Sequence, residues 1–230
     1  MTGDALPPEA AAAEPAGPRV VLFDFDGVLI HGDSFGLFVR HLYATPWRRL
    51  LFLLSLPLLL VLLPFSRWLV IRWLVGIALL GLDERRYMAE AEAFAASLAR
   101  RPKQFCRDGL QALRRHQAAG DRVLVVTGCE HTLVSGILRE LGLSDLEVLA
   151  SRFRPGGLGM RVLRHNVGRN KVLTLGEHGL TEWDVAYGDS MYDVAMMKVA
   201  VEPVLVNGTP ALCKKVEKIL GRPVTRVAWH

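Results

Sequence analysis

The chain has few cysteines and, over one long central stretch, no acidic residue. Three cysteines occur among the 230 residues, an odd number without the paired spacing of a metal site. This usage excludes a disulfide framework and favours a protein of a reducing compartment. Between Pro46 and Leu82 there is neither aspartate nor glutamate. An ordinary amphipathic helix has a charged or polar face, so this stretch is not ordinary protein surface.

The acid-free stretch is also strongly apolar. Residues 50–66 form a run of seventeen residues without a charge, and the apolar character resumes after Arg67 with only Arg72 interrupting it. The part between Leu51 and Leu63 is apolar around the whole helical wheel. Its first leg, residues 50–63, is about 21 Å long, which is short of the ~30 Å hydrocarbon core of a bilayer. We therefore expect two apolar legs that enter and leave one leaflet.

Prolines and basic residues mark where this hairpin bends and where it meets water. Pro57 predicts a kink, and the group at residues 64–66 predicts a turn. Arginines flank both ends, and tryptophans suited to the headgroup level lie among them: Arg48, Arg49, Arg85, Arg86, Trp47, Trp68 and Trp73. The positive-inside tendency places both ends on the cytoplasmic face, and a net charge of +5 favours an anionic surface. The alternative is a buried helical bundle inside a soluble cap.

The rest of the chain is typical of a single domain with a large insert. Residues 1–18 are rich in alanine and proline and lack the basic start and apolar core of a signal peptide, so they predict a disordered tail. There is no internal repeat. Basic residues are scattered without a nucleic-acid-binding signature, so we expect no nucleic-acid partner.

Two aspartates directly follow the apolar run Val20–Phe23. Such a run is typical of a buried parallel strand, and Asp24, Asp26 and Gly27 after it predict a loop that carries chemistry. One residue separates the two carboxylates, so both can reach the same atom, and Gly27 lets the backbone turn there. A turn without any chemistry is the alternative.

Further polar residues follow at the ends of later predicted elements. They are Thr127 and Gly128 after the apolar run 123–126, Lys171 at the start of a helical pattern, and Asp189 and Asp193 after the run 185–187. Because parallel strands joined by right-handed crossovers end on one edge of the sheet, we expect these side chains to lie together with Asp24.

Taken in this order, the segments between Arg19 and Leu220 resemble the four motifs of the haloacid dehalogenase superfamily of phosphohydrolases. The most similar branch is subfamily IB, which contains phosphoserine phosphatase. The resemblance implies a phosphomonoester hydrolase that forms an aspartyl-phosphate, with Asp24 as nucleophile and Asp26 as general acid and base. It also implies a Mg²⁺ site made by Asp24, Asp189 and the backbone carbonyl of Asp26.

The same resemblance assigns the phosphate to Thr127, Gly128 and Lys171. Asp193 is expected to orient Lys171 or the waters on the metal, with a helix N-terminal acid as the alternative. Asp33 is a candidate substrate contact at the start of the insert, and a helix N-cap is its alternative.

The apolar insert departs from the polar helical cap of phosphoserine phosphatases. It is similar to that of the membrane-associated C-type phosphatidylglycerophosphate phosphatases, which belong to the same branch. This similarity implies a lipid phosphate such as phosphatidylglycerophosphate as substrate. Two alternatives remain: a soluble phosphatase of small phosphoserine-like metabolites, and a membrane-tethered binding module without turnover. A non-catalytic module has no need of Asp26.

The expected fold is α/β, a doubly wound Rossmann-like parallel sheet with an inserted, strongly apolar helical cap. The catalytic core is predicted over residues 19–30 and 103–222, and the cap over 31–102, with the membrane hairpin at about 50–82. Other expected elements are helices over 83–100, 103–119 and 130–141, and a strand hairpin over 146–153 and 160–163.

Overall fold

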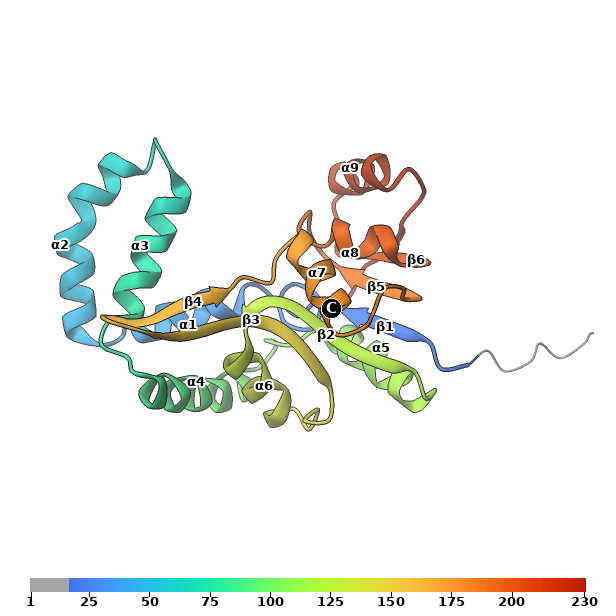
Figure 1. Cartoon of the computed structure of the whole chain (residues 1–230), viewed down its shortest axis with the longest axis horizontal. Coiled ribbons are helices and arrows are strands. Elements are labelled where there is room, and N and C mark those ends of the chain that lie inside the picture. The colour runs from blue at the N-terminus through green and yellow to red at the C-terminus, as the bar shows by residue number, and fades with distance from the viewer. Residues whose placement is uncertain (1–16) are drawn as a thin grey trace, which may run out of the picture.

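A seven-stranded sheet forms the centre of the computed structural model, which describes residues 17–230 (Figure 1). The strands lie in the order β4-β3-β2-β1-β5-β6-β7. Neighbouring strands are parallel except β3 and β4, which form an antiparallel hairpin at one edge. The strands are β1 (Val20–Phe23), β2 (Arg122–Glu130), β3 (Glu147–Gly156), β4 (Gly159–Arg164), β5 (Val185–Gly188), β6 (Glu202–Val206) and β7 (Thr225–Val227). The tail predicted over 1–18 lies outside the described residues, except for its last two.

Helices cover both faces of the sheet. Val21 and Phe23 of β1 pack into one apolar cluster with α1, α4, α5 and α6, while Leu22 packs into a second cluster with α7, α8 and α9. Burial on both faces explains why β1 is continuously apolar, and the predicted α/β architecture is confirmed. The helices are α1 (Ser34–Leu42), α2 (Pro46–Leu62), α3 (Arg67–Leu79), α4 (Glu84–Ala99), α5 (Arg107–Ala118), α6 (His131–Glu140), α7 (Arg169–Glu177), α8 (Val194–Val199) and α9 (Pro210–Leu220).

The strand order reverses at β1, which lies between β2 and β5. In an open α/β sheet, the loops at the carboxyl ends of the strands on either side of such a reversal enclose a crevice. Asp24 directly follows β1, and Asp189 directly follows β5. The backbone amide of Asp24 also donates to the carbonyl of Tyr187 at 2.9 Å, which ties the two strand ends together.

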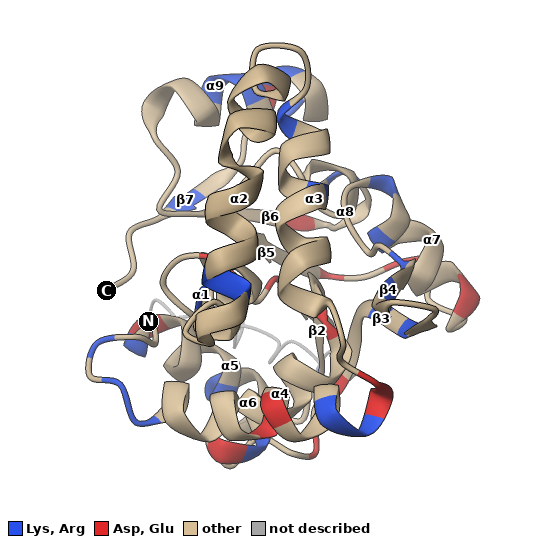
Figure 2. Ribbon diagram, turned by 90° about the vertical axis from the view of Figure 1, so that its left-hand side faces the viewer, with Lys and Arg blue, Asp and Glu red and all other residues tan. Residues whose placement is uncertain are grey.

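Helices α2 and α3 form over the acid-free stretch and pack side by side as a hairpin that projects from the sheet (Figures 1 and 2). The predicted turn at residues 64–66 is present, and the Ser66 hydroxyl caps α3 by accepting from the amide of Leu69. Pro57 lies inside α2. Many apolar side chains of the hairpin are exposed, including Phe65 at 82% and Leu54 at 69%. Where the hairpin projects from the body of the protein, few other residues of the chain therefore pack against its apolar side chains.

Over residues 17–230, no individual helix has both the length and the apolar character needed to cross a bilayer. One bent pair, α1 with α2 at an angle of 101°, meets both criteria when its helices are taken together.

The rest of the insert packs on the body of the protein. α4 lies against α6, and Tyr87 of α4 donates its hydroxyl to Glu130 at 2.7 Å. The helix predicted over 83–100 is thus present with Asp83 as its N-cap. α5 begins at Arg107 rather than at 103, because Lys103 has a left-handed φ of 58° and Cys106 caps the helix. α1 and α4 share the apolar cluster of the sheet, and Ala78 and Leu79 at the end of α3 join it, so the hairpin stands clear of the cluster only beyond the base of α3.

Candidate active site

The loop after β1 folds into a tight turn that presents both of its carboxylates. Gly27 has a φ of +78°, and its amide donates to the carbonyl of Ile30 at 2.8 Å. This conformation is rare for residues with a side chain, so glycine is needed there. The amide of Ser34, at the start of α1, donates to Asp26 Oδ1 at 2.8 Å. The orientation of Asp26 therefore depends on where the insert begins.

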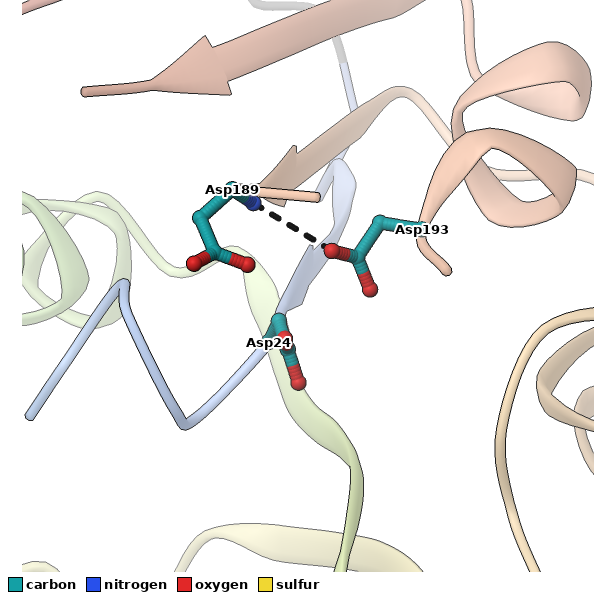
Figure 3. A group of neighbouring side chains, drawn as sticks. All are labelled: Asp24, Asp189 and Asp193. Atoms are coloured by element: carbon teal, nitrogen blue, oxygen red, sulfur yellow. Dashed lines mark hydrogen bonds between the residues drawn. The ribbon is translucent and has the colours of Figure 1, made fainter. Parts of the chain in front are cut away.

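Three aspartates from two strand ends converge on one point (Figure 3). One carboxylate oxygen from each of Asp24, Asp189 and Asp193 lies within 4.8 Å of the others. Asp189 also lies against the turn after β1, because a Cβ added to Gly27 would be 1.9 Å from Asp189 Oδ2. Glycine at position 27 thus allows the turn and makes room for the second acid.

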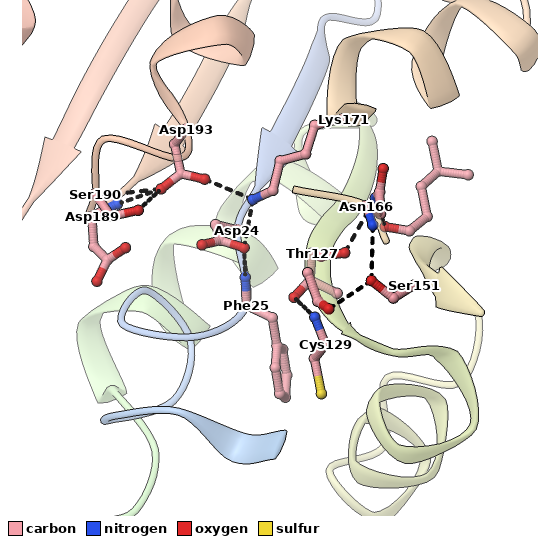
Figure 4. Close-up of polar contacts among 12 residues, drawn as sticks. Asp24, Phe25, Thr127, Cys129, Ser151, Asn166, Lys171, Asp189, Ser190 and Asp193 are labelled. Atoms are coloured by element: carbon pink, nitrogen blue, oxygen red, sulfur yellow. Dashed lines mark hydrogen bonds and ion pairs between the residues drawn. The ribbon is translucent and has the colours of Figure 1, made fainter. Parts of the chain in front are cut away.

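Lys171, at the start of α7, is buried between two of these acids (Figure 4). Its ammonium lies 2.8 Å from Asp24 Oδ1 and 2.6 Å from Asp193 Oδ1. Burial by itself would lower the pKa of Lys171, but the charges of Asp24 and Asp193 outweigh burial and raise it. Lys171 is therefore a fixed positive charge beside the proposed nucleophile.

Asp193 is fully buried, and both of its oxygens are engaged. Oδ1 accepts from Lys171, and Oδ2 accepts from the amides of Asp189 and Ser190 and from the Ser190 hydroxyl. Of the three roles predicted for Asp193, this geometry supports the orientation of Lys171. Because its oxygens are taken, Asp24 and Asp189 are the acids of the cluster left to bind a cation.

Burial raises the pKa of the carboxyl groups that face this site. For Asp24 the rise caused by burial and by the charge of Asp193 is only partly offset by Lys171, so its pKa lies well above the usual range. Burial raises the pKa of Asp26 to about 6 against the opposing hydrogen bond from Ser34. Burial and the charge of Asp193 raise the pKa of Asp189 to about 6. A cation held between Asp24 and Asp189 would favour their charged forms.

The donor set suits Mg²⁺. The ion prefers a small number of carboxylates completed by carbonyl, substrate and water oxygens, and Asp24 and Asp189 present two carboxylates at neighbouring strand ends. The backbone carbonyl of Asp26, predicted as a further ligand, belongs to the same turn. Sulfur and imidazole ligands are absent from the acidic cluster found in the described part of the chain, so a softer metal has no matching donors there.

Thr127 and Gly128 lie on β2, beside β1 in the sheet. The Thr127 side chain is fully buried, and its oxygen accepts from the amide of Cys129 at 3.0 Å, which leaves the hydroxyl proton available to a phosphate oxygen. Figure 4 shows Thr127 on the same side of the site as Lys171. The predicted phosphate-binding residues thus come from strand β2 and helix α7.

Two buried polar residues that the sequence analysis missed hold this segment in place (Figure 4). Asn166 donates to the carbonyls of Thr127 and Leu149, at 3.2 and 2.8 Å, and Ser151 donates to the carbonyl of Gly128 at 2.7 Å. The backbone N–H of Asn166 in turn donates to the Ser151 hydroxyl. Asn166 is recognisable in the sequence as a polar residue just before Gly168 and Lys171. Its role is not, because its hydrogen-bond partners are distant in sequence.

Asp33 and Cys129 have structural roles. Asp33 caps α1 by accepting from the amide of Gly36 at 2.9 Å, which supports the N-cap alternative over substrate contact. Cys129 is buried and accepts from the Ser34 hydroxyl at 3.1 Å. Burial and the nearby Asp26 raise the pKa of the Cys129 thiol well above its usual value, so it is not an activated nucleophile.

Comparison with known families places this site in context. Residues 21–198 match the model of the haloacid dehalogenase-like hydrolases. Protein CicA of Caulobacter vibrioides is 30% identical to the chain over 196 residues, which is 80% of this chain and 84% of CicA. The family match over residues 21–198 contains every residue assigned to the site above.

Solved structures share the fold. A Bordetella pertussis protein of unknown function superposes with a TM-score of 0.67 at 20% identity, covering 90% of this chain and 98% of that one. A substrate-bound phosphoserine phosphatase superposes with a TM-score of 0.55 at 18% identity, covering 87% of this chain and 91% of the phosphatase. At these identities the similarity concerns the fold alone.

Proposed function

The chain belongs to the haloacid dehalogenase-like hydrolases, and we propose that it is a Mg²⁺-dependent phosphomonoester hydrolase that forms an aspartyl-phosphate on Asp24. The observation that carries this proposal is the buried ammonium of Lys171, placed within 2.8 Å of Asp24 and 2.6 Å of Asp193. A carboxylate attacks a phosphate dianion only where positive charge offsets the repulsion between them, and Lys171 supplies such a charge from a fixed position.

In the first step, a carboxylate oxygen of Asp24 forms a bond to phosphorus while the bond from phosphorus to the ester oxygen breaks. Asp26 in its acid form donates a proton to the departing alkoxide, which leaves as an alcohol. Lys171 and the Thr127 hydroxyl bind the phosphoryl oxygens, and the amide of Gly128 is a further donor beside them.

In the second step, water attacks phosphorus and gives a proton to the ionised Asp26. The bond from phosphorus to Asp24 breaks, which restores the carboxylate and releases orthophosphate. Asp26 thus ends the cycle with its proton replaced. Asp193 keeps Lys171 oriented through both steps, and the Asn166 and Ser151 side chains keep the Thr127 segment in place.

Mg²⁺ would be held by Asp24, Asp189 and the carbonyl of Asp26, and when bound it supplies positive charge that neutralises the phosphate and the clustered carboxylates. The chain's own contribution is a rigid arrangement of these ligands, because Gly27 and Asp189 contact each other directly.

The proposed substrate is a lipid phosphate such as phosphatidylglycerophosphate. Its support is the α2–α3 hairpin, which presents many exposed apolar side chains and no acid, a combination that favours lipid over water. The substrate's acyl chains would remain in the leaflet while its phosphate reaches Asp24.

The hairpin is proposed to enter one leaflet from the cytoplasmic face. Its two ends return to the same body of protein, so both must lie on the same side of the membrane. Arg48 and Arg49 precede the first apolar leg, and Arg85 and Arg86 follow the second. This distribution agrees with the positive-inside tendency and supports the proposal that the active site faces the cytoplasm.

A small soluble phosphomonoester is the second candidate substrate. The fold is shared with phosphoserine phosphatase structures, and the site as described has no residue that selects a lipid headgroup over a free metabolite. The exposed apolar side chains of the α2–α3 hairpin favour the lipid, whereas the fold shared with phosphoserine phosphatase structures favours phosphoserine.

Phosphate release measured in parallel from phosphatidylglycerophosphate, lysophosphatidate and phosphoserine tests the proposal. The purified protein in Mg²⁺ buffer should hydrolyse the lipids faster, and Asp24→Asn should release no phosphate above background. A clear preference for phosphoserine would end the lipid proposal. Equal activity in Asp24→Asn would end the assignment of the nucleophile.

A further inference from the structure

A groove of about 660 Å³ lies between α3 and the turn that joins β3 to β4. Its helical wall comes from α3 and its C-cap, including Leu69, Arg72, Trp73, Gly76 and Leu80, and Leu62 of α2 lies beside them. The β3–β4 turn, residues 157–161, forms the opposite wall. We call this feature the α3 groove. None of the residues that line it belongs to the catalytic site.

The α3 groove has the length of one bilayer leaflet. Its helical wall runs from Leu69 to Leu80, which is about 17 Å at ~1.5 Å per residue. One leaflet contributes about 15 Å of hydrocarbon to a bilayer. The groove volume also falls in the range of about 300–1,000 Å³ that is typical of small-molecule sites.

The charge of the lining suits an anionic lipid. Arg72 and Arg161 are the charged residues among those that line the groove, and no acid accompanies them. The remaining lining residues are apolar or glycine. An acyl chain of the substrate matches the apolar floor, and the two guanidinium groups match the anionic headgroups of neighbouring lipids in the membrane.

Glycines keep both walls open. Gly76 lies in the interior of α3, where glycine is less favourable than alanine. A Cβ at Gly76 would meet nothing within 4 Å, and the same holds for Gly157 on the facing turn. A larger side chain at either position would therefore not clash with the protein itself. It would instead fill space in the groove, which explains glycine at both positions if the groove holds a ligand.

The distance from the groove to the phosphate site fits a lipid. Ser151 contacts Gly128 at the site, and the backbone from Ser151 along β3 to Gly157 in the following turn spans about 20 Å at ~3.3 Å per residue. One leaflet with its headgroup region is also about 20 Å thick. A small metabolite in the catalytic site cannot reach the groove, but an extended lipid phosphate can.

We propose that the α3 groove binds one acyl chain of the lipid substrate and so makes hydrolysis depend on chain length. This proposal rests on the proposed lipid phosphatase function. It adds that the chain is held by the protein, between α3 and the β3–β4 turn, rather than left free in the bilayer.

The test compares variants that fill the groove with a matched variant elsewhere. Gly76→Leu and Gly157→Leu each place a side chain in the groove from a different wall. Gly176→Leu is the control, because Gly176 lies in helix α7, is exposed and has equally open space around its Cβ. The readout is the ratio of kcat/KM for dioleoyl phosphatidate to that for dihexanoyl phosphatidate in mixed micelles. A ratio is insensitive to a loss of properly folded enzyme.

We expect each filling variant to lower this ratio by about tenfold, which corresponds to ~1.4 kcal/mol of lost binding, and the control to keep the wild-type ratio. An unchanged ratio in both filling variants overturns the proposal. Hydrolysis of para-nitrophenyl phosphate by the wild type without hydrolysis of either phosphatidate overturns the lipid function itself, and the groove proposal with it.

A second measurement uses only the wild-type chain. A phosphatidate with a photoreactive diazirine at the end of one acyl chain is crosslinked to the protein in vesicles, and the labelled peptides are identified by mass spectrometry. Crosslinks within residues 69–80 and 157–161 support the proposal. Crosslinks confined to the exposed face of α2 contradict it.

Discussion

Lys171 shows how a single residue links the fold to the chemistry. A buried ammonium without partners is costly, but here Asp24 and Asp193 both contact it, so its charge is retained. The same contacts fix its position beside the phosphoryl group in the proposed mechanism. Substitution at this site should therefore affect stability and activity together.

Asp193→Asn should lower the free energy of unfolding by about 1.5–3 kcal/mol, because it removes a charge-assisted hydrogen bond to the buried Lys171 ammonium, which then keeps only Asp24 as a charged partner. Activity should fall as well, since Lys171 loses one of its two anchors. Urea denaturation measures the first effect and phosphate release the second. Asp145→Asn is the control, because that residue is exposed and, among the described residues, its carboxylate accepts a hydrogen bond only from the neighbouring Ser144, so its change should stay within about 0.5 kcal/mol. Equal stability of the two variants would contradict the role of the buried pair.

Asp26 should produce an alkaline limb in the pH profile. Its pKa is raised to about 6, so the acid form that protonates the leaving group predominates below that pH and is lost above it. We expect kcat/KM for an alkyl phosphate to fall as the pH rises through about 6, and Asp26→Asn to abolish this limb with a loss of activity of about 10²–10⁴-fold.

para-Nitrophenyl phosphate provides the internal control for this prediction. Its phenolate leaves without a proton, so Asp26→Asn should reduce the rate of its first step much less. An alkaline limb that persists unchanged in Asp26→Asn with an alkyl phosphate would show that another group is the acid.

At the scale of elements, the projecting α2–α3 hairpin is the part whose apolar surface contributes least to the fold. Leu54, Leu60 and Phe65 are exposed, whereas Leu59 on α2 is 5% exposed. The triple change of the exposed three to aspartate should alter the free energy of unfolding by no more than about 1.5 kcal/mol, at ~0.5 for each surface site. Leu59→Ala should cost about 2–5 kcal/mol because it leaves a cavity.

Vesicles of phosphatidylglycerol should show the reverse order of effects: the triple variant, which is stable, loses membrane binding, and Leu59→Ala, which is destabilised, keeps it. The triple variant should remain in the supernatant after sedimentation, because charge on an inserting surface is costly, while folded Leu59→Ala should sediment with the vesicles. Retention of the triple variant on the vesicles would contradict insertion of the hairpin.

The type of an element could be predicted where residues close in sequence determine it. The residues at which helices and strands begin and end were harder to predict. The turn at 64–66 and the cap at Asp83 follow from local residues. The start of α5 does not, because the left-handed backbone of Lys103 delays it. The extent of the β3–β4 hairpin also exceeds the predicted strands, since pairing continues to Gly156 and Gly159 close to α3.

At the scale of the whole molecule, the order of acids at strand ends allowed both the fold and most of the site to be predicted. Asp24 and Asp189 meet because β1 and β5 are neighbours and parallel, which follows from the strand–helix alternation. Asn166, Ser151 and the contact from Ser34 to Asp26 could not be predicted in this way. They depend on how distant loops pack, and no local periodicity encodes that.

Covalent trapping tests the central claim most directly. The protein is mixed with a phosphatidate and Mg²⁺, quenched in acid within one turnover, digested and examined by mass spectrometry. Phosphate should be found on the peptide containing Asp24, and Asp24→Asn should carry none. Phosphate on a different residue, or continued turnover by Asp24→Asn without any phosphorylated peptide, would contradict the account.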